Sequence, residues 1–346
     1  MQRISSLAGT SPRRYEPGGV SAGTERSRVR PPTQAFSLVA QDMARAEGQL
    51  TELLGSRLDD VRGVAHYLAA AGGKRVRPLL TALGARAVGV GGDLSRLMCV
   101  GEVIHLGSLL HDDVVDDAST RRGRDAAQHV YGNALVILTG DYCLAQGVLI
   151  ASEHGGHACV SRLAEAVKDM AEGEVLQLQR AGDLGTTMDE YLEVIDRKSA
   201  ALIAWCASAG ALILDDEALV GRMERFGRAV GVAFQVTDDI LDYGGVEAVT
   251  GKALGADLKD RKLTLPLLIA MKELPELRER LDAGPPTDEE LPELLALVRG
   301  TGALERSADY ARGLVEEGIE ELSVLPPSPH REALASLARY LVERVS

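Results

Sequence analysis

The sequence predicts an all-α fold, on three grounds. From about Phe36 onward Ala, Leu, Glu and Arg dominate, and apolar residues recur at helical spacing, for example between Leu94 and Ile104. Hardly any stretch alternates apolar and polar residues as a half-buried strand does. Turn signals also divide the chain into pieces of helix length. These signals are Gly72-Gly73, Gly91-Gly92, Gly155-Gly156, Gly244-Gly245 and Pro285-Pro286.

The chain divides into a tail and one helical domain. Residues 1–33 combine Ser, Pro, Gly and Arg with few apolar residues, which is typical of a disordered basic tail. Residues 34–346 are enough for a single domain with a sizeable core. No apolar segment follows the N-terminal arginines, so we expect no secretory signal. The apolar stretch from Ser199 to Leu214 is shorter than the roughly 20 residues of a bilayer-spanning helix, and we expect a buried core helix there.

The charge and the cysteines narrow the class of protein. With 38 Lys and Arg against 51 Asp and Glu, the net charge is −13. An acidic chain is a poor ligand for phosphate backbones, so we expect no nucleic-acid partner. The four cysteines contain no close pair, which indicates neither a disulfide framework nor a four-thiolate zinc site. Reduced thiols and a cytoplasmic location are the simplest interpretation. The cysteines are Cys99, Cys143, Cys159 and Cys206.

Two acidic clusters with the same spacing are the strongest feature of the sequence, DDVVD at 112–116 and DDILD at 238–242. On a helix, Asp112 and Asp116 lie one turn apart on nearly the same face, and His105 lies two turns before Asp112. Four polar residues of the second cluster fall within about 100° of one another on an otherwise apolar helix. These are Gln235, Asp238, Asp239 and Asp242.

Carboxylates one turn apart repel each other, so a cation must offset them if they are buried. Hard oxygen ligands suit Mg²⁺, which usually binds through a few carboxylates together with substrate phosphates. Two facing clusters would therefore clamp a diphosphate through shared Mg²⁺ ions. The alternative, a solvated helix end, suits one isolated cluster better than two matched clusters in apolar helices. Neither cluster has the alternating aspartates and central glycine of a calcium loop.

Basic residues are concentrated near these clusters. The segment GGKRVRP at 72–78 places Lys74 and Arg77 beside a glycine-rich turn that leads into a helix. Arg121 and Arg122 follow the first cluster, and their planar guanidinium groups suit phosphate oxygens. Neutralisation of the nearby aspartates is an equally good interpretation of either arginine alone. Three lysines near the later motifs have surface exposure as their simplest alternative. They are Lys198, Lys252 and Lys262.

In this order, five segments resemble the trans-type isoprenyl diphosphate synthases, also called polyprenyl synthetases. The segments are GGKRVRP, HLGSLLHDDVVDDASTRRG, RKSA, FQVTDDILDY and GKALGADLKDRKLTLP. The resemblance extends over nearly all of the chain from about residue 36 onward. It implies the isoprenoid synthase fold, in which helices surround a deep central cavity, and a homodimer.

The resemblance also implies roles for individual residues. Mg²⁺ bridging an allylic diphosphate would be bound by Asp112, Asp116 and Asp238, with Asp113, Asp239 and Asp242 in support. The allylic substrate would be contacted by Arg121, Lys198, Ser199, Gln235 and Lys252, and Lys198 joins the aspartates in the catalytic set. The diphosphate of isopentenyl diphosphate would be held by Lys74, Arg77, His105 and Arg122. We expect Lys262 to bind substrate as well, although Arg261 stands before it where the family often has Gly.

The implied activity is Mg²⁺-dependent condensation of isopentenyl diphosphate with an allylic diphosphate. Metal ions and cationic side chains stabilise the departing diphosphate and leave an allylic carbocation in a dry apolar pocket. The alkene of isopentenyl diphosphate attacks the cation, and loss of a proton completes the elongation. Dipoles of Ser199 and Gln235 would stabilise the cation, and the released diphosphate is a plausible base.

The product length follows from a second family feature. Bulky residues one and two turns before the first aspartate cluster act there as a floor that stops chain growth. Here those positions are Ser108, Gly107 and Ile104, none of them aromatic. We expect an open channel and a product of about seven to ten isoprene units, the size of quinone side chains. A lower floor built from a following helix remains an alternative, through Leu135, Val136 or Leu138.

Three other functions stay open at this point. A short-chain farnesyl or geranylgeranyl diphosphate synthase would share every motif above. A class I terpene cyclase also uses an aspartate-rich helix and Mg²⁺, but it does not need a second diphosphate site. A noncatalytic subunit of a heteromeric synthase typically loses aspartates, which this chain keeps. A peripheral membrane contact during release of the greasy product is also left open.

Overall fold

The computed structural model describes residues 33–121, 123–244 and 254–343. Within these ranges the regular structure is helical apart from one two-stranded hairpin, so the all-α prediction is confirmed. The tail predicted over residues 1–33 lies outside the described residues except for Thr33, and the predicted domain boundary stays a prediction.

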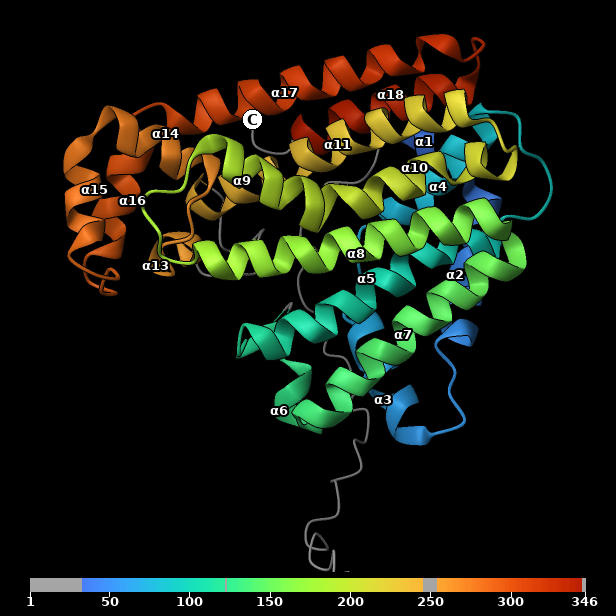
Figure 1. Cartoon of the computed structure of the whole chain (residues 1–346), viewed down its shortest axis with the longest axis horizontal. Helices are drawn as coiled ribbons and strands as arrows, with labels where there is room; N and C mark the ends of the chain where they lie inside the picture. The colour runs from blue at the N-terminus through green and yellow to red at the C-terminus, as the bar shows by residue number, and fades with distance from the viewer. Residues whose placement is uncertain (1–32, 122, 245–253, 344–346) are drawn as a thin grey trace, which may run out of the picture.

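The first half of the chain forms α1 (Thr33–Leu38), α2 (Ala40–Leu53), α3 (Asp59–Ala69), α4 (Val76–Ala87), α5 (Ser95–Val115), α6 (Ala127–Tyr131) and α7 (Asn133–His154). Of these helices, α3 and α6 lie lowest in Figure 1, whereas α1 and α4 lie higher, next to α18 (Pro329–Val342). The hairpin strands β1 (Thr120–Arg121) and β2 (Arg124–Asp125) connect α5 to α6.

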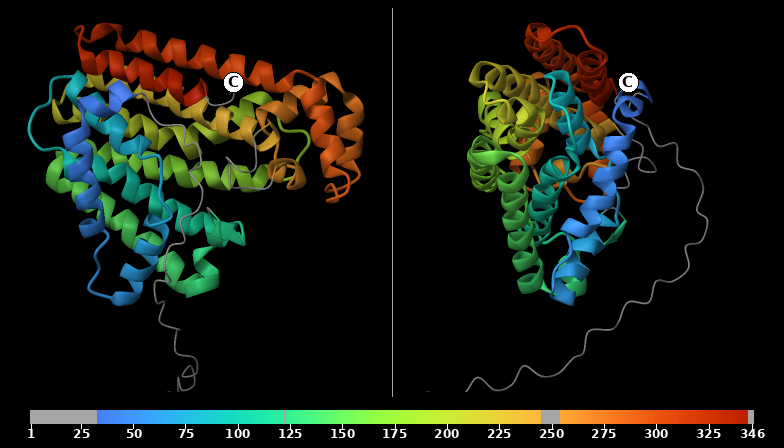
Figure 2. Two further views of the ribbon diagram at one scale, coloured as in Figure 1. Left: turned by 180° about the vertical axis from the view of Figure 1, so that it is seen from behind. Right: turned by 90° about the vertical axis from the view of Figure 1, so that its right-hand side faces the viewer.

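Helices of the second half complete the bundle and form one end of it. They are α8 (Gly156–Arg180), α9 (Met188–Ile195), the π-helical turn η1 (Asp196–Ala200), α10 (Ala201–Ile213), α11 (Glu217–Gly244), α13 (Ala256–Lys259), α14 (Leu265–Glu273), α15 (Pro275–Asp282), α16 (Leu291–Gly300), α17 (Ala303–Glu321), the 3₁₀ turn η2 (Leu322–Val324) and α18 (Pro329–Val342). Both figures of the whole chain place α17 and α18 along one side and α3 and α6 on the opposite side (Figures 1 and 2).

The core is centred on α10, which packs between α4, α8 and α11. Twelve residues of α10 are buried, so the prediction of a core helix over Ser199 to Leu214 is confirmed. Glycines allow the close approach of its neighbour α4. A Cβ atom on Gly210 would lie 2.4 Å from the Cα atom of Ala85, and one on Gly84 would lie 2.5 Å from the carbonyl oxygen of Ala207. Burial of this apolar surface is the main stabilising contribution to the fold.

The helix α7 is apolar on its outer side as well as toward the core. It is long and apolar enough to cross a membrane by length and composition, with a mean hydropathy of 1.7 over its 18-residue window, yet only 39% of that window is buried. Its exposed apolar side chains recur at helical spacing. They are Ile137, Leu138, Val148 and Leu149.

Candidate active site

The first aspartate cluster ends α5, and a half-buried stripe leads along that helix to it. His105, Ser108 and Asp112 are half-buried, whereas most other residues of α5 are buried. Their spacing of three and four residues places them on one face. The backbone N–H of Asp116 donates to the carbonyl of Asp112 over 2.8 Å, so these aspartates lie one turn apart, as predicted.

The side chain of Asp113 is fully buried beside this stripe and is held by Arg121. The Nε and Nη2 atoms of Arg121 each lie 2.6 Å from Oδ1 of Asp113. The β1–β2 hairpin turns the chain back so that Arg121 reaches the end of α5. Gln128 fixes the same region by donating to the carbonyls of Asp113 and Ala118 over 2.7 and 2.6 Å. Of the two interpretations of Arg121, the structure therefore contains the pairing with an aspartate.

Charges from three other segments converge on Asp112. Burial raises the pKa of this carboxyl to about 6, and the negative charges of Glu174 and Asp116 act in the same direction. The positive charges of Lys198 and Arg121 oppose this shift. Asp112 therefore lies where α5, α8, η1 and the hairpin meet. A cation bound there would favour the ionised carboxylate.

Lys198 comes from the π-helical turn η1, a type of turn that is frequent at functional sites. Its Nζ atom lies 2.5 Å from Oε2 of Glu174 on α8. Gly173 allows this contact, because a Cβ atom there would lie 2.5 Å from the backbone nitrogen of Lys198. A glycine on α8 thus brings the lysine to the aspartate cluster.

A chain of hydrogen bonds runs from η1 into the second cluster on α11. Ser199 Oγ donates to Oε1 of Gln235 over 2.8 Å, and Nε2 of Gln235 donates to Oδ1 of Asp239 over 2.9 Å. The hydroxyl of Tyr191 donates to Oδ2 of Asp239 over 2.7 Å. Burial raises the pKa of Asp239 to about 6, while Lys262 opposes the shift. Both oxygens of this buried carboxyl therefore have fixed partners.

Asp242 ends the same cluster and is tied to α13. The backbone N–H of Asp257 donates to Oδ2 of Asp242 over 2.9 Å. Burial raises the pKa of Asp242 to about 6, and the charge of Asp257 adds to the shift. Lys262 Nζ lies 3.3 Å from Oδ1 of Asp257. Burial would lower the pKa of Lys262, but the surrounding carboxylates, Asp257 and Asp239 above all, outweigh it and raise the pKa.

The departure at Arg261 does not displace Lys262 from the second cluster. Arg261 adopts the left-handed region with φ 49°, which explains why glycine suits this position. Its Nη1 atom donates to the carbonyl of Leu281 over 3.2 Å, and its guanidinium lies against Gly182. These contacts offset part of the backbone strain and leave Lys262 facing the aspartates.

Asp260 is influenced by one aspartate of the first cluster and by a neighbour of the second cluster. The pKa of Asp260, in the loop after α13, is raised by burial and by the negative charges of Asp257 and Asp116. Asp116 belongs to the first cluster, whereas Asp257 is bonded to the second. Asp260 therefore lies near Asp116 and near the segment that Asp242 contacts, and the facing of the two clusters stays a prediction.

Two of the remaining predicted basic residues, Lys74 and Arg77, lie just before α4 and at its start. Burial lowers the pKa of Arg77, and the negative charges of Glu102 and Asp238 oppose the shift. The Nε atom of Arg77 is buried and has no hydrogen-bond partner among the described residues. Lys74 is exposed in the loop before α4. Two predicted substrate contacts, Arg122 and Lys252, lie outside the described residues.

The donor set fits a hard divalent cation. Carboxylate side chains outnumber the Lys and Arg side chains near them, and several of these carboxyls have a raised pKa. One oxygen of Asp113, Oδ2, is buried without a hydrogen-bond partner in the described part of the chain. No group of three His, Cys, Asp or Glu side chains within the described ranges is close enough to hold a metal ion alone. Mg²⁺ in proteins commonly takes only one or two carboxylates and completes its shell with water and phosphate.

Only one of the three family floor positions lies on the half-buried stripe. Ser108 is on it, between His105 and Asp112. Gly107 faces α7 instead, where a Cβ atom would lie 3.0 Å from the carbonyl oxygen of Gly140. Ile104 is also buried there, against Gly147. Gly107 is therefore small because two helices touch at it, and its size does not itself open a channel.

The proposed lower floor on α7 is also only partly possible. Val136 is buried and Leu135 is half-buried, so both face other helices. Leu138 is 61% exposed on the outer side of α7. Of the three residues of that alternative, Leu138 does not fit, because it lies on the opposite face of α7 from Val136 and Gly140.

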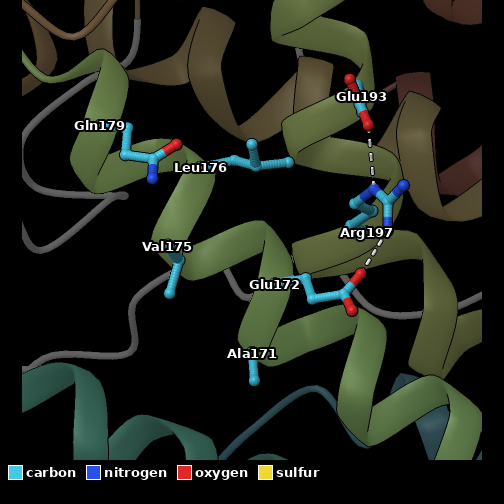
Figure 3. Close-up of a pocket in the computed structure, with 7 residues that line it drawn as sticks. All are labelled: Ala171, Glu172, Val175, Leu176, Gln179, Glu193 and Arg197. Carbon is cyan, nitrogen blue, oxygen red and sulfur yellow. Dashed lines mark hydrogen bonds and ion pairs between the residues drawn. The ribbon is translucent and has the colours of Figure 1, made fainter.

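A shallow pocket lies on the outer side of the contact between α8 and η1. Figure 3 shows Arg197 in it, bridging Glu172 on α8 and Glu193 on α9 over 2.6 and 3.1 Å. Val175 and Leu176 supply its apolar wall. Arg197 thus ties α8 to η1 from outside, while its neighbour Lys198 makes the inner contact with Glu174.

Several residues in this region were missed by sequence reasoning. Asp257 and Asp260 stand within the quoted segment GKALGADLKDRKLTLP, so their motif was a usable signal. Glu174 follows Gly173, where α8 contacts η1, but the sequence does not show which helix α8 contacts. Tyr191 had no signal, because a tyrosine in an amphipathic helix is commonly a core residue.

Comparison with known proteins gives a consistent result. Residues 59–298 match the Polyprenyl synthetase family. The chain is 37% identical over 316 residues to the octaprenyl diphosphate synthase of Escherichia coli (strain K12), covering 89% of this chain and 97% of that one. It is 34% identical to the all-trans-nonaprenyl-diphosphate synthase (geranyl-diphosphate specific) of Rhodobacter capsulatus, covering 89% and 96%. The crystal structure of a polyprenyl synthase from Caulobacter crescentus CB15, complexed with calcium and isoprenyl diphosphate, superposes with a TM-score of 0.86 at 36% identity, covering 93% and 100%.

The helical bundle and its paired aspartate clusters are those of a prenyltransferase with the isoprenoid synthase fold. More particularly, the chain belongs to the polyprenyl synthetase family.

Proposed function

We propose that this protein is a Mg²⁺-dependent trans-polyprenyl diphosphate synthase that adds isopentenyl diphosphate to an allylic diphosphate. The observation that carries the proposal is that positively charged side chains lie near aspartates of both clusters. Lys198 and Arg121 act on Asp112, and Lys262 acts on Asp239. Facing carboxylates with cations beside them suit a substrate that brings negative oxygens and metal ions together.

The metal ligands in this proposal are Asp112, Asp116 and Asp238. When bound, Mg²⁺ supplies neutralisation of the negative charge on the departing diphosphate. The supporting aspartates have fixed orientations, because Arg121 holds Asp113 while Tyr191 and Gln235 hold Asp239. Support of this kind orients ligands and keeps them basic.

The allylic substrate is contacted by Lys198, Arg121, Ser199, Gln235 and Lys252. Because Nε2 of Gln235 donates to Asp239, Oε1 of Gln235 is directed toward Ser199. Fixed oxygen dipoles stabilise positive charge where the diphosphate has left. The alkene carbon of isopentenyl diphosphate bonds to that position, and the released diphosphate takes the proton that is lost.

The second diphosphate, that of isopentenyl diphosphate, is held by Lys74, Arg77, His105 and Arg122. The buried, unpartnered Nε atom of Arg77 supports this role within the described part of the chain. The charge of Asp238 acts on Arg77, which supports two adjoining substrate sites. A terpene cyclase does not need the second of these sites.

We propose a product of about seven to ten isoprene units, of the size found in quinone side chains. Ser108 is small and lies on the half-buried stripe beside Asp112, which supports a long tail passing that point. The names of the octaprenyl and nonaprenyl diphosphate synthases that the chain resembles support the same length.

We further propose a homodimer formed through α7 and a cytoplasmic location. The exposed apolar side chains of α7 support burial against a second copy, since single soluble chains rarely expose such a face. Four free cysteines, all buried, are in keeping with a reducing compartment. A peripheral membrane contact would give the apolar product a place to leave.

Diphosphate release tests the proposal. Mg²⁺-dependent release that requires both substrates supports elongation, whereas release with an allylic substrate alone indicates a cyclase. Absence of release from the purified chain indicates a noncatalytic partner subunit. Asp112→Ala should nearly abolish release without unfolding the protein, and unchanged activity would refute the metal assignment.

A further inference from the structure

Arg75 lies between two proposed ligands of isopentenyl diphosphate, Lys74 and Arg77, yet its side chain is already occupied. Its Nε and Nη2 atoms donate to the two carboxylate oxygens of Glu47 over 2.9 and 2.8 Å, and Nη1 donates to Glu102 over 2.8 Å. Only 16% of the side chain is exposed. With two carboxylates bound, Arg75 has no net positive charge to offer a substrate diphosphate.

The backbone of Arg75 shows what these ion pairs hold in place. Arg75 has φ 52°, in the left-handed region that residues with a Cβ atom rarely adopt. It precedes α4, and its carbonyl accepts from the N–H of Leu79 over 3.2 Å. The turn of the chain between Lys74 and Arg77 therefore depends on an unfavourable conformation that the two glutamates stabilise.

Glu102 connects this turn to the rest of the proposed site. It is 4% exposed and lies on α5, three residues before His105. Its charge acts on Arg77 as well as on Arg75. One buried carboxylate on the helix that carries His105 thus pairs with Arg75, and its neighbour Gly101 lies against the Arg77 side chain. Loss of the charged partner of such a buried carboxylate is strongly destabilising.

We propose that Glu47, Arg75 and Glu102 are positioning residues for the isopentenyl diphosphate site, an inference that rests on the function proposed above. They hold Lys74 and Arg77 on one side of the turn and keep the Arg77 guanidinium next to His105's helix. They touch neither substrate themselves. Their loss weakens the use of isopentenyl diphosphate and leaves the allylic site unchanged.

Glu102→Gln separates positioning from simple electrostatics. Removal of a negative charge beside Arg77 would by itself strengthen binding of a diphosphate. Loss of positioning has the opposite effect, because small displacements of binding groups are costly. We expect the KM for isopentenyl diphosphate to rise about tenfold, with the KM for the allylic substrate changed by less than about twofold.

Arg75→Lys tests the same network without a change of charge. A lysine cannot engage two carboxylates with the fixed geometry of a guanidinium. We expect the same selective rise in the KM for isopentenyl diphosphate. Glu47 is 58% exposed, so Glu47→Gln should have a smaller effect in the same direction.

The matched control is an ion pair at the other end of α4. Arg86 donates to Asp42 through Nε and Nη2 over 3.2 and 2.8 Å, with side-chain exposure close to that of Arg75 and Glu102. Arg86→Lys and Asp42→Asn should lower the melting temperature and leave both KM values unchanged. Circular dichroism establishes that each variant is folded.

An unchanged or lowered KM for isopentenyl diphosphate in Glu102→Gln and Arg75→Lys overturns the inference while the wild type remains an active synthase. A rise of equal size in Arg86→Lys overturns it too, because general loosening of α4 would then be the cause. Wild-type protein that neither binds isopentenyl diphosphate in a calorimetric titration nor consumes it contradicts the proposed function itself.

Discussion

Lys198 Nζ and Glu174 Oε2 lie 2.5 Å apart, and both charges act on Asp112. Glu174 is thus a third acidic element of the site, supplied by α8 rather than by either aspartate cluster. The contact exists because Gly173 lets α8 touch the π-helical turn. Glu174 therefore fixes where the lysine points before substrate binds.

Glu174→Gln should lower kcat about tenfold, since a neutral amide holds Lys198 less firmly than a carboxylate does. Glu172→Gln is the control on the same helix, because Glu172 binds Arg197 on the outer surface. Steady-state kinetics of both variants check the prediction. Equal losses in the two would show that Glu174 matters only for packing of α8.

The raised pKa values predict opposite pH dependences for metal-free stability and activity. Asp112, Asp239 and Asp242 have pKa values of about 6, above the ordinary aspartate value, with burial as the first cause. Between about pH 4 and 6 these three carboxyls therefore bind more protons in the folded state than in the unfolded state, and their contribution to stability falls as pH rises through this window.

Metal binding requires the ionised carboxylates, so turnover should rise with pH through about 6. Thermal unfolding with EDTA and with Mg²⁺ checks the stability, and initial rates over the same pH range check the turnover. Relative to a variant that lacks one of these carboxyls, the metal-free melting temperature should fall across the window, and Mg²⁺ should raise it most above pH 6. Carboxyls with lowered pKa values, such as Glu190 and Glu321, act in the opposite direction, so the test compares wild type with Asp112→Asn. A metal-free wild type that gains stability relative to Asp112→Asn from pH 4 to 6 would contradict the assignment for Asp112.

Substitution of Arg261 should give an unusual order of stabilities. Glycine removes the left-handed strain but loses the hydrogen bond to Leu281, and these effects nearly cancel. Alanine keeps the strain and loses the same bond. Arg261→Ala should therefore be less stable than Arg261→Gly by about 1 kcal/mol in denaturant unfolding. An alanine variant as stable as the glycine variant would show that the left-handed conformation is relaxed in solution.

A charge on the outer face of α7 should disrupt the proposed homodimer. Leu138→Glu places a carboxylate within the exposed apolar face of that helix. Leu58→Glu is a control at a residue of similar exposure outside α7. Light scattering should show a dimer for the wild type and the control and a monomer for Leu138→Glu. A monomeric wild type would refute the proposal.

Local geometry is the part of this site that the sequence predicts well. The placement of His105 and Asp112 on one side of α5 follows from helical periodicity alone. The partner of Arg121 does not follow from periodicity, because the contact depends on how the hairpin folds back onto Asp113. The contact of Lys198 with Glu174 depends on helix packing at Gly173, which the period of either helix does not reveal.

The positions expected to form the floor also depend on helix packing that the sequence does not reveal. Gly107 is one residue away from Ser108, and that step of about 100° turns it from the half-buried stripe toward α7. Spacing identified the right helix, but which of its faces meets a neighbour is set by tertiary packing.

The length of the product made from farnesyl diphosphate and isopentenyl diphosphate with Mg²⁺ tests the central claim most directly. Mass spectrometry of the products should show all-trans chains of about seven to ten isoprene units. No elongation of farnesyl diphosphate, or a single addition that stops at about 20 carbons, would contradict the claim and assign the protein to the short-chain synthases.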